Sequence, residues 1–80
     1  MRCIYRESKI VDKQQSIKIM VYVPETDKEV EDLAPMIVLD NEFTNRRATE
    51  VFPQRTSEAR VIREAIKMID KAEVEAVHIK

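Results

Sequence analysis

The residue pair best suited to covalent chemistry in this chain is Cys3 and His78, each the only residue of its kind. A cysteine thiolate can attack a carbonyl carbon, and a histidine can take the thiol proton. Such a pair also needs an orienting third group and an oxyanion site, and the sequence offers neither. Because a buried cysteine and a half-exposed strand histidine are the commoner arrangement, we expect no catalytic residues and no enzyme activity.

A second set of residues could bind phosphates or an acidic protein through positive charge. Four cations share one narrow sector of an expected helix, opposite its apolar side, and three arginines precede that helix. Glu64 and Asp70 lie three or four positions from these cations and can pair with them, so a solvated helix face is the alternative interpretation. With two Tyr, two Phe and no Trp, the chain offers little for stacking on bases. The candidate residues for binding a partner or nucleic acid are Arg46, Arg47, Arg55, Arg60, Arg63, Lys67 and Lys71.

Carboxylates gather in the middle of the chain. Residues 24–43 hold seven acidic side chains and one basic one, whereas the segments on either side are net basic. Such a cluster could dock onto a basic partner, and much of it also suits a helix start, where the macrodipole favours negative charge. Asp40 and Glu42 lack the further ligands and the glycine of a calcium loop, so we expect no metal and no other cofactor. The candidate acidic docking residues are Glu25, Asp27, Glu29, Glu31 and Asp32.

The elements that must position these side chains begin with strands. Cys3–Tyr5 and Ser16–Val23 favour strands, and the second segment alternates between two faces. The polar residues Asp12–Gln15 between them predict a hairpin turn. A continuous apolar run, Met36–Leu39, predicts a central strand that is covered on both faces. Further strand signals span Ala48–Phe52 and Val74–Ile79.

Two helices complete the pattern. Thr26 and Glu29 fit a capping box, which predicts a short helix near residues 27–34 that Pro35 ends. A longer helix is expected over roughly residues 57–72, where apolar residues recur at helical spacing and cover about half the circumference. That width is enough to lie across a sheet. The apolar residues are Val61, Ile62, Ala65, Ile66, Met68, Ile69 and Ala72.

Together these elements predict an α+β two-layer sandwich, in which a four- or five-stranded, mainly antiparallel sheet carries the long helix on one face. The segment Thr56–Ile66 by itself resembles the first helix of a ribbon-helix-helix DNA-binding protein. That family needs a second helix afterwards, and here the residues that remain have strand character, so the sandwich is preferred. With 80 residues, the chain is expected to form one domain over residues 1–80.

Composition restricts the function classes further. Glycine is absent, which excludes the phosphate loop, the dinucleotide fingerprint and the glycine-based nucleophile elbow. The net charge of −1 fits neither a basic nucleic-acid-binding body nor a strongly acidic mimic. One cysteine excludes an internal disulfide, and no apolar run reaches the length of a signal peptide or a membrane span. We therefore expect a cytoplasmic protein that does not bind a membrane.

By exclusion, the sequence predicts a small noncatalytic protein-binding module, an accessory or inhibitory regulator in a prokaryotic or viral setting. Its contact surface would be a sheet edge or the charged helix face, and its partner a protein, with a homodimer as one form. The alternative is a nucleic-acid-binding regulator that uses the basic helix face. No small-molecule substrate is expected. The two hypotheses differ in salt dependence, because phosphate binding weakens steeply as salt rises whereas apolar or edge-strand association does not.

Overall fold

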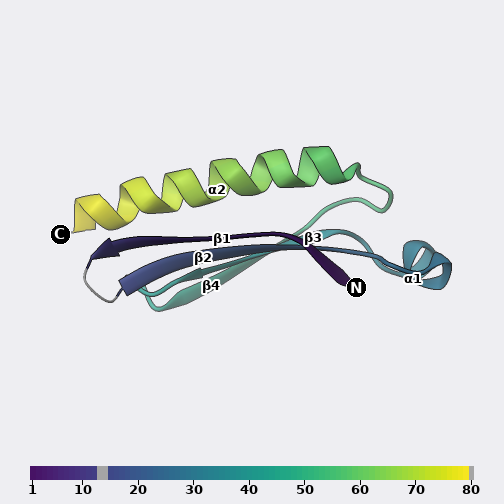
Figure 1. Ribbon diagram of the computed structural model, residues 1–80, viewed down its shortest axis with the longest axis horizontal. Coiled ribbons are helices and arrows are strands. Elements are labelled where there is room, and N and C mark those ends of the chain that lie inside the picture. Colours follow the sequence, from purple (N-terminus) through teal and green to yellow (C-terminus); the bar gives the residue numbers. More distant parts are fainter. Residues whose placement is uncertain (13–14, 80) are drawn as a thin grey trace.

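The structure, a computed structural model that describes residues 1–12 and 15–79, is a four-stranded antiparallel sheet with a long helix on one face (Figure 1). This confirms the predicted fold class. The molecule is elongated, with principal extents of 45 × 18 × 16 Å. In chain order the elements are β1 (Arg2–Asp12), β2 (Gln15–Val23), α1 (Asp27–Asp32), β3 (Met36–Asn41), β4 (Arg46–Val51) and α2 (Glu58–Ile79), and the strands lie in the order β1-β2-β3-β4.

The core lies between α2 and one face of the sheet. In β2 every second residue is apolar, so these side chains all point to the face that the helix covers. Three of the residues that α2 buries are alanines, whose small side chains let the helix approach the sheet closely. The buried hydrophobic residues are Ile17, Ile19, Val21, Val23, Ile37, Phe52, Val61, Ala65, Ile69, Ala72 and Ala76.

The first two strands form the expected antiparallel pair, in which Asp12 lies opposite Gln15. The predicted turn over Asp12–Gln15 includes residues 13–14, which lie outside the described residues. The short helix α1 is also confirmed. The Thr26 side chain accepts a hydrogen bond from the Glu29 backbone N–H at 3.1 Å, and the Glu29 carboxylate accepts one from the Thr26 N–H at 3.2 Å. These two bonds are the capping box that predicted the helix.

The prediction of a strand over Val74–Ile79 is wrong, because α2 continues without a break to Ile79. The buried residues Ile69, Ala72 and Ala76 continue the i, i+3, i+4 spacing of the helix, so the last turns still pack on the sheet. Val74 and Val77 favour a strand locally and are exposed on this helix. Tertiary packing therefore overrides their local preference. Because the segment after residue 72 belongs to α2 itself, it does not form the separate second helix that a ribbon-helix-helix protein needs.

The stripe that α2 buries is also narrower than predicted. Ile69 is fully buried, whereas Ile62 is half-buried and Ile66 is 41% exposed. Ile66 lies about 100° around the helix from Ala65, the middle of the buried stripe. A helix on one sheet contacts it along a single side, so apolar residues at the margin of a wide stripe remain in solvent.

Among the residues that the structure describes, two positions with left-handed backbone are filled without glycine. Asn45, with φ of 54°, closes the β3–β4 hairpin, and Asn41 supports this turn by accepting hydrogen bonds from the N–H groups of Phe43 and Thr44. Asparagine tolerates this backbone region better than most residues do. Arg55, with φ of 66°, holds the same conformation just before α2 and has no such advantage.

We expect the substitution R55G to raise the free energy of unfolding by about 0.5 kcal/mol. A residue with a Cβ atom costs about 1–2 kcal/mol in left-handed backbone, and the greater entropy of unfolded glycine offsets part of the gain. Urea denaturation would measure the change. The control T44G changes a residue of the β3–β4 turn whose φ is not positive, and this variant should lose stability. A loss of stability in both variants would show that the backbone at Arg55 is not strained.

Candidate functional site

The predicted helix cations do lie together. Arg60, Arg63, Lys67 and Lys71 are exposed on α2, on the side away from its buried stripe. Their charge is partly compensated, because the Lys67 ammonium lies 3.5 Å from the Glu64 carboxylate. The face is therefore a mixed-charge surface, which is the usual exterior of a helix in solution.

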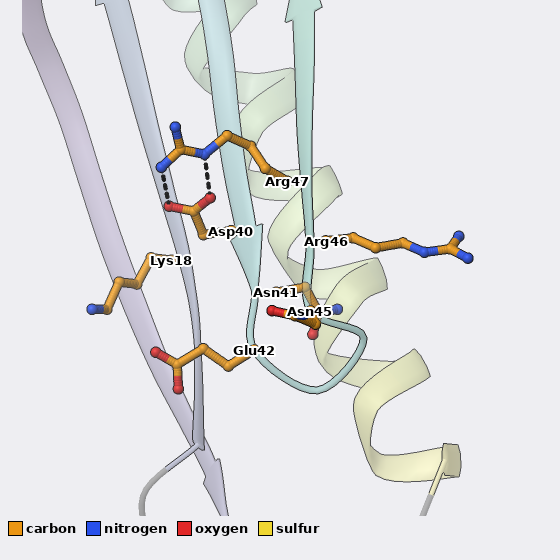
Figure 2. Close-up of a pocket in the computed structure, with 7 residues that line it drawn as sticks. All are labelled: Lys18, Asp40, Asn41, Glu42, Asn45, Arg46 and Arg47. Atoms are coloured by element: carbon orange, nitrogen blue, oxygen red, sulfur yellow. Dashed lines mark hydrogen bonds and ion pairs between the residues drawn. The ribbon is translucent and has the colours of Figure 1, made fainter.

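The three predicted arginines outside α2 do not all lie on one side of the sheet. Arg46 and Arg47 are neighbours on β4, so their side chains point to opposite faces of the sheet. Arg47 lies on the face away from α2, beside Asp40 (Figure 2). Arg55 is exposed in the connection from β4 to α2. The structure thus distributes the cations over both sides of the molecule.

The predicted acidic cluster surrounds α1. Four of its members, Glu25, Asp27, Glu31 and Asp32, are exposed. The fifth, Glu29, is engaged within the chain, since its carboxylate caps the helix and lies 2.6 Å from the N-terminal ammonium of Met1. That ammonium and the backbone N–H groups of the cap hold the pKa of Glu29 below its usual range. Docking of a basic partner on the four exposed carboxylates stays a prediction.

Cys3 and His78 are not brought together. Arg2, beside Cys3, reaches Glu58 in the first turn of α2, whereas Lys9 reaches Asp70 and Glu73 much further along that helix. Strand β1 and helix α2 therefore run in the same direction (Figure 1). Cys3 belongs to the start of β1 and His78 to the end of α2, so the two positions are far apart. The half-buried Cys3 thiol donates a hydrogen bond to the Tyr5 carbonyl at 3.4 Å.

The face of the sheet away from α2 carries an apolar patch that sequence reasoning missed. β3 is an inner strand, as predicted, but the expectation that both of its faces are covered is wrong, because α2 covers one face (Figure 1). On the other face, half-buried side chains form cross-strand pairs between β2 and β3. The alternation in β2 contained the signal, because two residues on its outward side are apolar. We call this set the open-face patch: Met20, Tyr22, Met36, Val38 and the exposed Val51 of β4.

Beside the open-face patch lies a polar hollow of about 300 Å³ at the β3–β4 hairpin (Figure 2). Arg47 donates two hydrogen bonds to Asp40, from Nε to Oδ1 at 2.6 Å and from Nη2 to Oδ2 at 3.1 Å. This guanidinium holds the pKa of Asp40 below its ordinary value of 3.8. Arg46 points away from the ion pair (Figure 2). Cations and carboxylates both line the hollow, which consists of Lys18, Asp40, Asn41, Glu42, Asn45, Arg46 and Arg47.

The Asp40–Arg47 pair should make stability depend on pH. Because the pKa of Asp40 is lower in the folded chain than in the unfolded chain, the pair stabilises the fold above about pH 4 and this contribution disappears as the pH falls through the folded pKa. We expect D40N to be less stable than the parent at about pH 7 and to approach it at about pH 2. Urea denaturation at a series of pH values would measure this. In an R47A background, the loss of stability caused by D40N should depend little on pH. If that loss depends on pH as strongly as it does when Arg47 is present, the pair is not its cause.

The two edges of the sheet differ in how open they are. β1 pairs with β2 through two irregularities, between Cys3 and Tyr5 and between Ile10 and Asp12, and such bulges hinder the addition of another strand. α2 contacts β1, β2 and β3. In contrast, β4 pairs with β3 in regular register, and all six of its side chains are exposed. β4 is therefore the more accessible edge.

The backbone pattern shows which groups of β4 face outward. The Phe52 N–H donates to the Pro35 carbonyl at 2.9 Å, so this antiparallel pair is a hydrogen-bonded one. Hydrogen-bonded and non-bonded pairs alternate along an antiparallel ladder. Ala48 and Glu50 therefore direct their N–H and C=O groups toward β3. Arg47, Thr49 and Val51 direct theirs away from the sheet, where another strand can bind them.

Neither a metal centre nor a membrane span is found in the part of the chain that the structure describes. No group of three or more His, Cys, Asp or Glu side chains there could hold a metal ion. No helix among the same residues is long and apolar enough to cross a membrane. Comparison with protein-family models, with curated proteins and with solved structures finds no match for this chain.

Proposed function

We propose that the protein is a small noncatalytic protein-binding module of the cytoplasm that receives a strand of its partner on the outer edge of β4. The observation that carries this proposal is the openness of β4, which has regular register, exposed side chains on both faces, and outward backbone groups at Arg47, Thr49 and Val51. Main-chain hydrogen bonds to such an edge supply affinity in strand addition. An accessory or inhibitory role suits this mode, since covering another protein's surface requires no chemistry.

The open-face patch supports the same proposal. It adjoins β4, because Val51 lies opposite Met36 and Thr49 lies opposite Val38. Methionine side chains adapt to the shape of an apolar partner, and Tyr22 adds aromatic area. A strand bound at β4 could thus place apolar side chains against this patch. The charged helix face receives less support, because Lys67 pairs with Glu64, and because Arg47 lies on the other face of the sheet and is bound to Asp40.

The substitution T49P is the sharpest test of the β4 edge. The Thr49 N–H points away from β3, so proline removes an outward donor and leaves the β3–β4 ladder intact. The matched control R60S/R63S/K67S alters the helix face and should also remain folded, as circular dichroism and a cooperative thermal transition would show. We would capture partners from the native host with the parent and both variants, with and without nuclease.

We expect a protein partner that survives nuclease, persists with R60S/R63S/K67S and is lost with T49P. Binding through main-chain and apolar contacts should also tolerate added salt. Recovery that depends on nucleic acid, weakens steeply with salt and is lost with R60S/R63S/K67S would instead favour the nucleic-acid-binding alternative.

A further inference from the structure

We propose that the strand bound by β4 is β4 of a second copy of this chain, in an antiparallel two-fold pairing centred on Ala48. The inference rests on the proposed use of the β4 edge and names its occupant. It starts from two charges at opposite ends of this strand. Arg46 and Glu50 are exposed, lie on the same face of β4, and form no ion pair with any residue that the structure describes.

Arg46 and Glu50 cannot pair with each other within one copy. Four residues along a strand span about 13 Å, which is far beyond the length of an ion pair. A second β4 that runs in the opposite direction reverses this order. It can therefore place its Glu50 opposite Arg46 and its Arg46 opposite Glu50, so the strand is complementary to itself in charge.

Symmetry leaves few registers to choose from. A two-fold pairing at the edge continues the sheet, so a residue can lie opposite only a residue of the second copy that points to the same face. Centring on Arg47 places Arg46 opposite Ala48 and makes no ion pair, and centring on Glu50 places two glutamates opposite each other. Like charges directly opposite destabilise a pair of strands. Centring on Thr49 places Glu50 opposite Ala48 and makes no ion pair, whereas centring on Ala48 makes two.

The backbone fits the same register. Centring on Ala48 sets Arg47 opposite Thr49 of the second copy, and both residues direct their N–H and C=O groups outward. These residues therefore form the hydrogen-bonded pairs. Arg46 and Glu50 fall in the non-bonded pairs, where facing side chains approach more closely. Arg47 points to the other face and is already neutralised by Asp40, so it does not oppose the association.

Charge reversal tests this register directly. Sedimentation equilibrium of the full chain should show a monomer–dimer equilibrium. We expect R46E and E50R each to weaken the dimer by about tenfold or more, because each replaces two attractive pairs with two repulsive ones. An equimolar mixture of R46E and E50R should form a heterodimer, since every pair across its edge is again attractive. The double variant R46E/E50R should likewise form a homodimer.

Two variants control for other causes. R63E makes the same kind of charge reversal on α2, away from the edge, and should dimerise like the parent. T49P should be a folded monomer, because it lacks an outward donor. A monomer at every concentration up to about 1 mM, or a dimer that R46E and E50R do not weaken, would overturn the proposal. The proposed function is tested separately: a monomeric chain whose captured partner is lost with T49P keeps the β4 edge as a binding site and excludes the second copy as its occupant.

Discussion

The substitution I69A is expected to lower the free energy of unfolding by about 3 kcal/mol. Ile69 is fully buried between α2 and the sheet. Its truncation removes apolar contacts and leaves a cavity that the surrounding core can only partly fill. For a chain of 80 residues, total stability is on the order of 4–12 kcal/mol, so this loss should be visible in both urea and thermal denaturation.

I66A is the matched control for this prediction. Ile66 lies three residues earlier on the same helix and is 41% exposed, so the substitution has the same chemistry and the same effect on helix propensity. We expect a change within about 1 kcal/mol. The sequence placed both isoleucines in one apolar stripe, and this pair of variants shows which side of the stripe faces the sheet. Equal losses would mean that α2 is rotated about its axis relative to the structure.

The substitution A76D should be about as damaging, with an expected loss of about 2–4 kcal/mol. Ala76 is fully buried in the last turns of α2, the segment for which the sequence predicted a strand. A carboxylate placed there must lose its water of hydration, and the apolar core that surrounds Ala76 offers it no partner. The result would be measured by urea denaturation at neutral pH, where the aspartate is charged in the unfolded chain.

V77D separates burial from the other effects of an aspartate near a helix C-terminus. Val77 is the next residue and is 55% exposed. An acidic residue near the end of a helix opposes the macrodipole in both variants, so the difference between them reports the burial of Ala76. We expect V77D to lose much less stability than A76D. Similar stabilities would contradict the packing of these last turns on the sheet.

Much of the fold could be predicted because its signals are local. The alternation from Ile17 to Val23 identifies a strand and its buried face, and the pair Thr26 and Glu29 identifies a helix start. Both depend on neighbours a few residues away. Val74 and Val77 misled for the opposite reason. Their preference for a strand is weak, and it was outweighed by Ala76, which packs against a sheet formed much earlier in the chain.

The candidate site was less predictable. The residues of β4 gave only a weak strand signal, and their charges suggested a basic surface continuous with the helix. In the structure, β4 pairs with β3, and Arg46 and Arg47 point to opposite faces of the sheet. The two hydrogen bonds from Arg47 to the Asp40 carboxylate neutralise Arg47 within the chain. The open-face patch escaped notice because Met20 and Tyr22 occupy the outward side of an otherwise well-patterned strand. An outward position is assumed to be solvated unless the neighbouring strands are known.

By itself, the sequence determined the kinds of elements and most of their buried sides, because periodicity and capping act through the nearest turn or the next residue. Only the tertiary structure decided which strands lie at the edges, which face α2 leaves open, and that β4 directs Arg47, Thr49 and Val51 outward. These properties depend on pairing between residues far apart in the chain. Hydrogen bonding of one strand to another is nearly independent of side-chain type, so composition and spacing alone leave the order of the strands open.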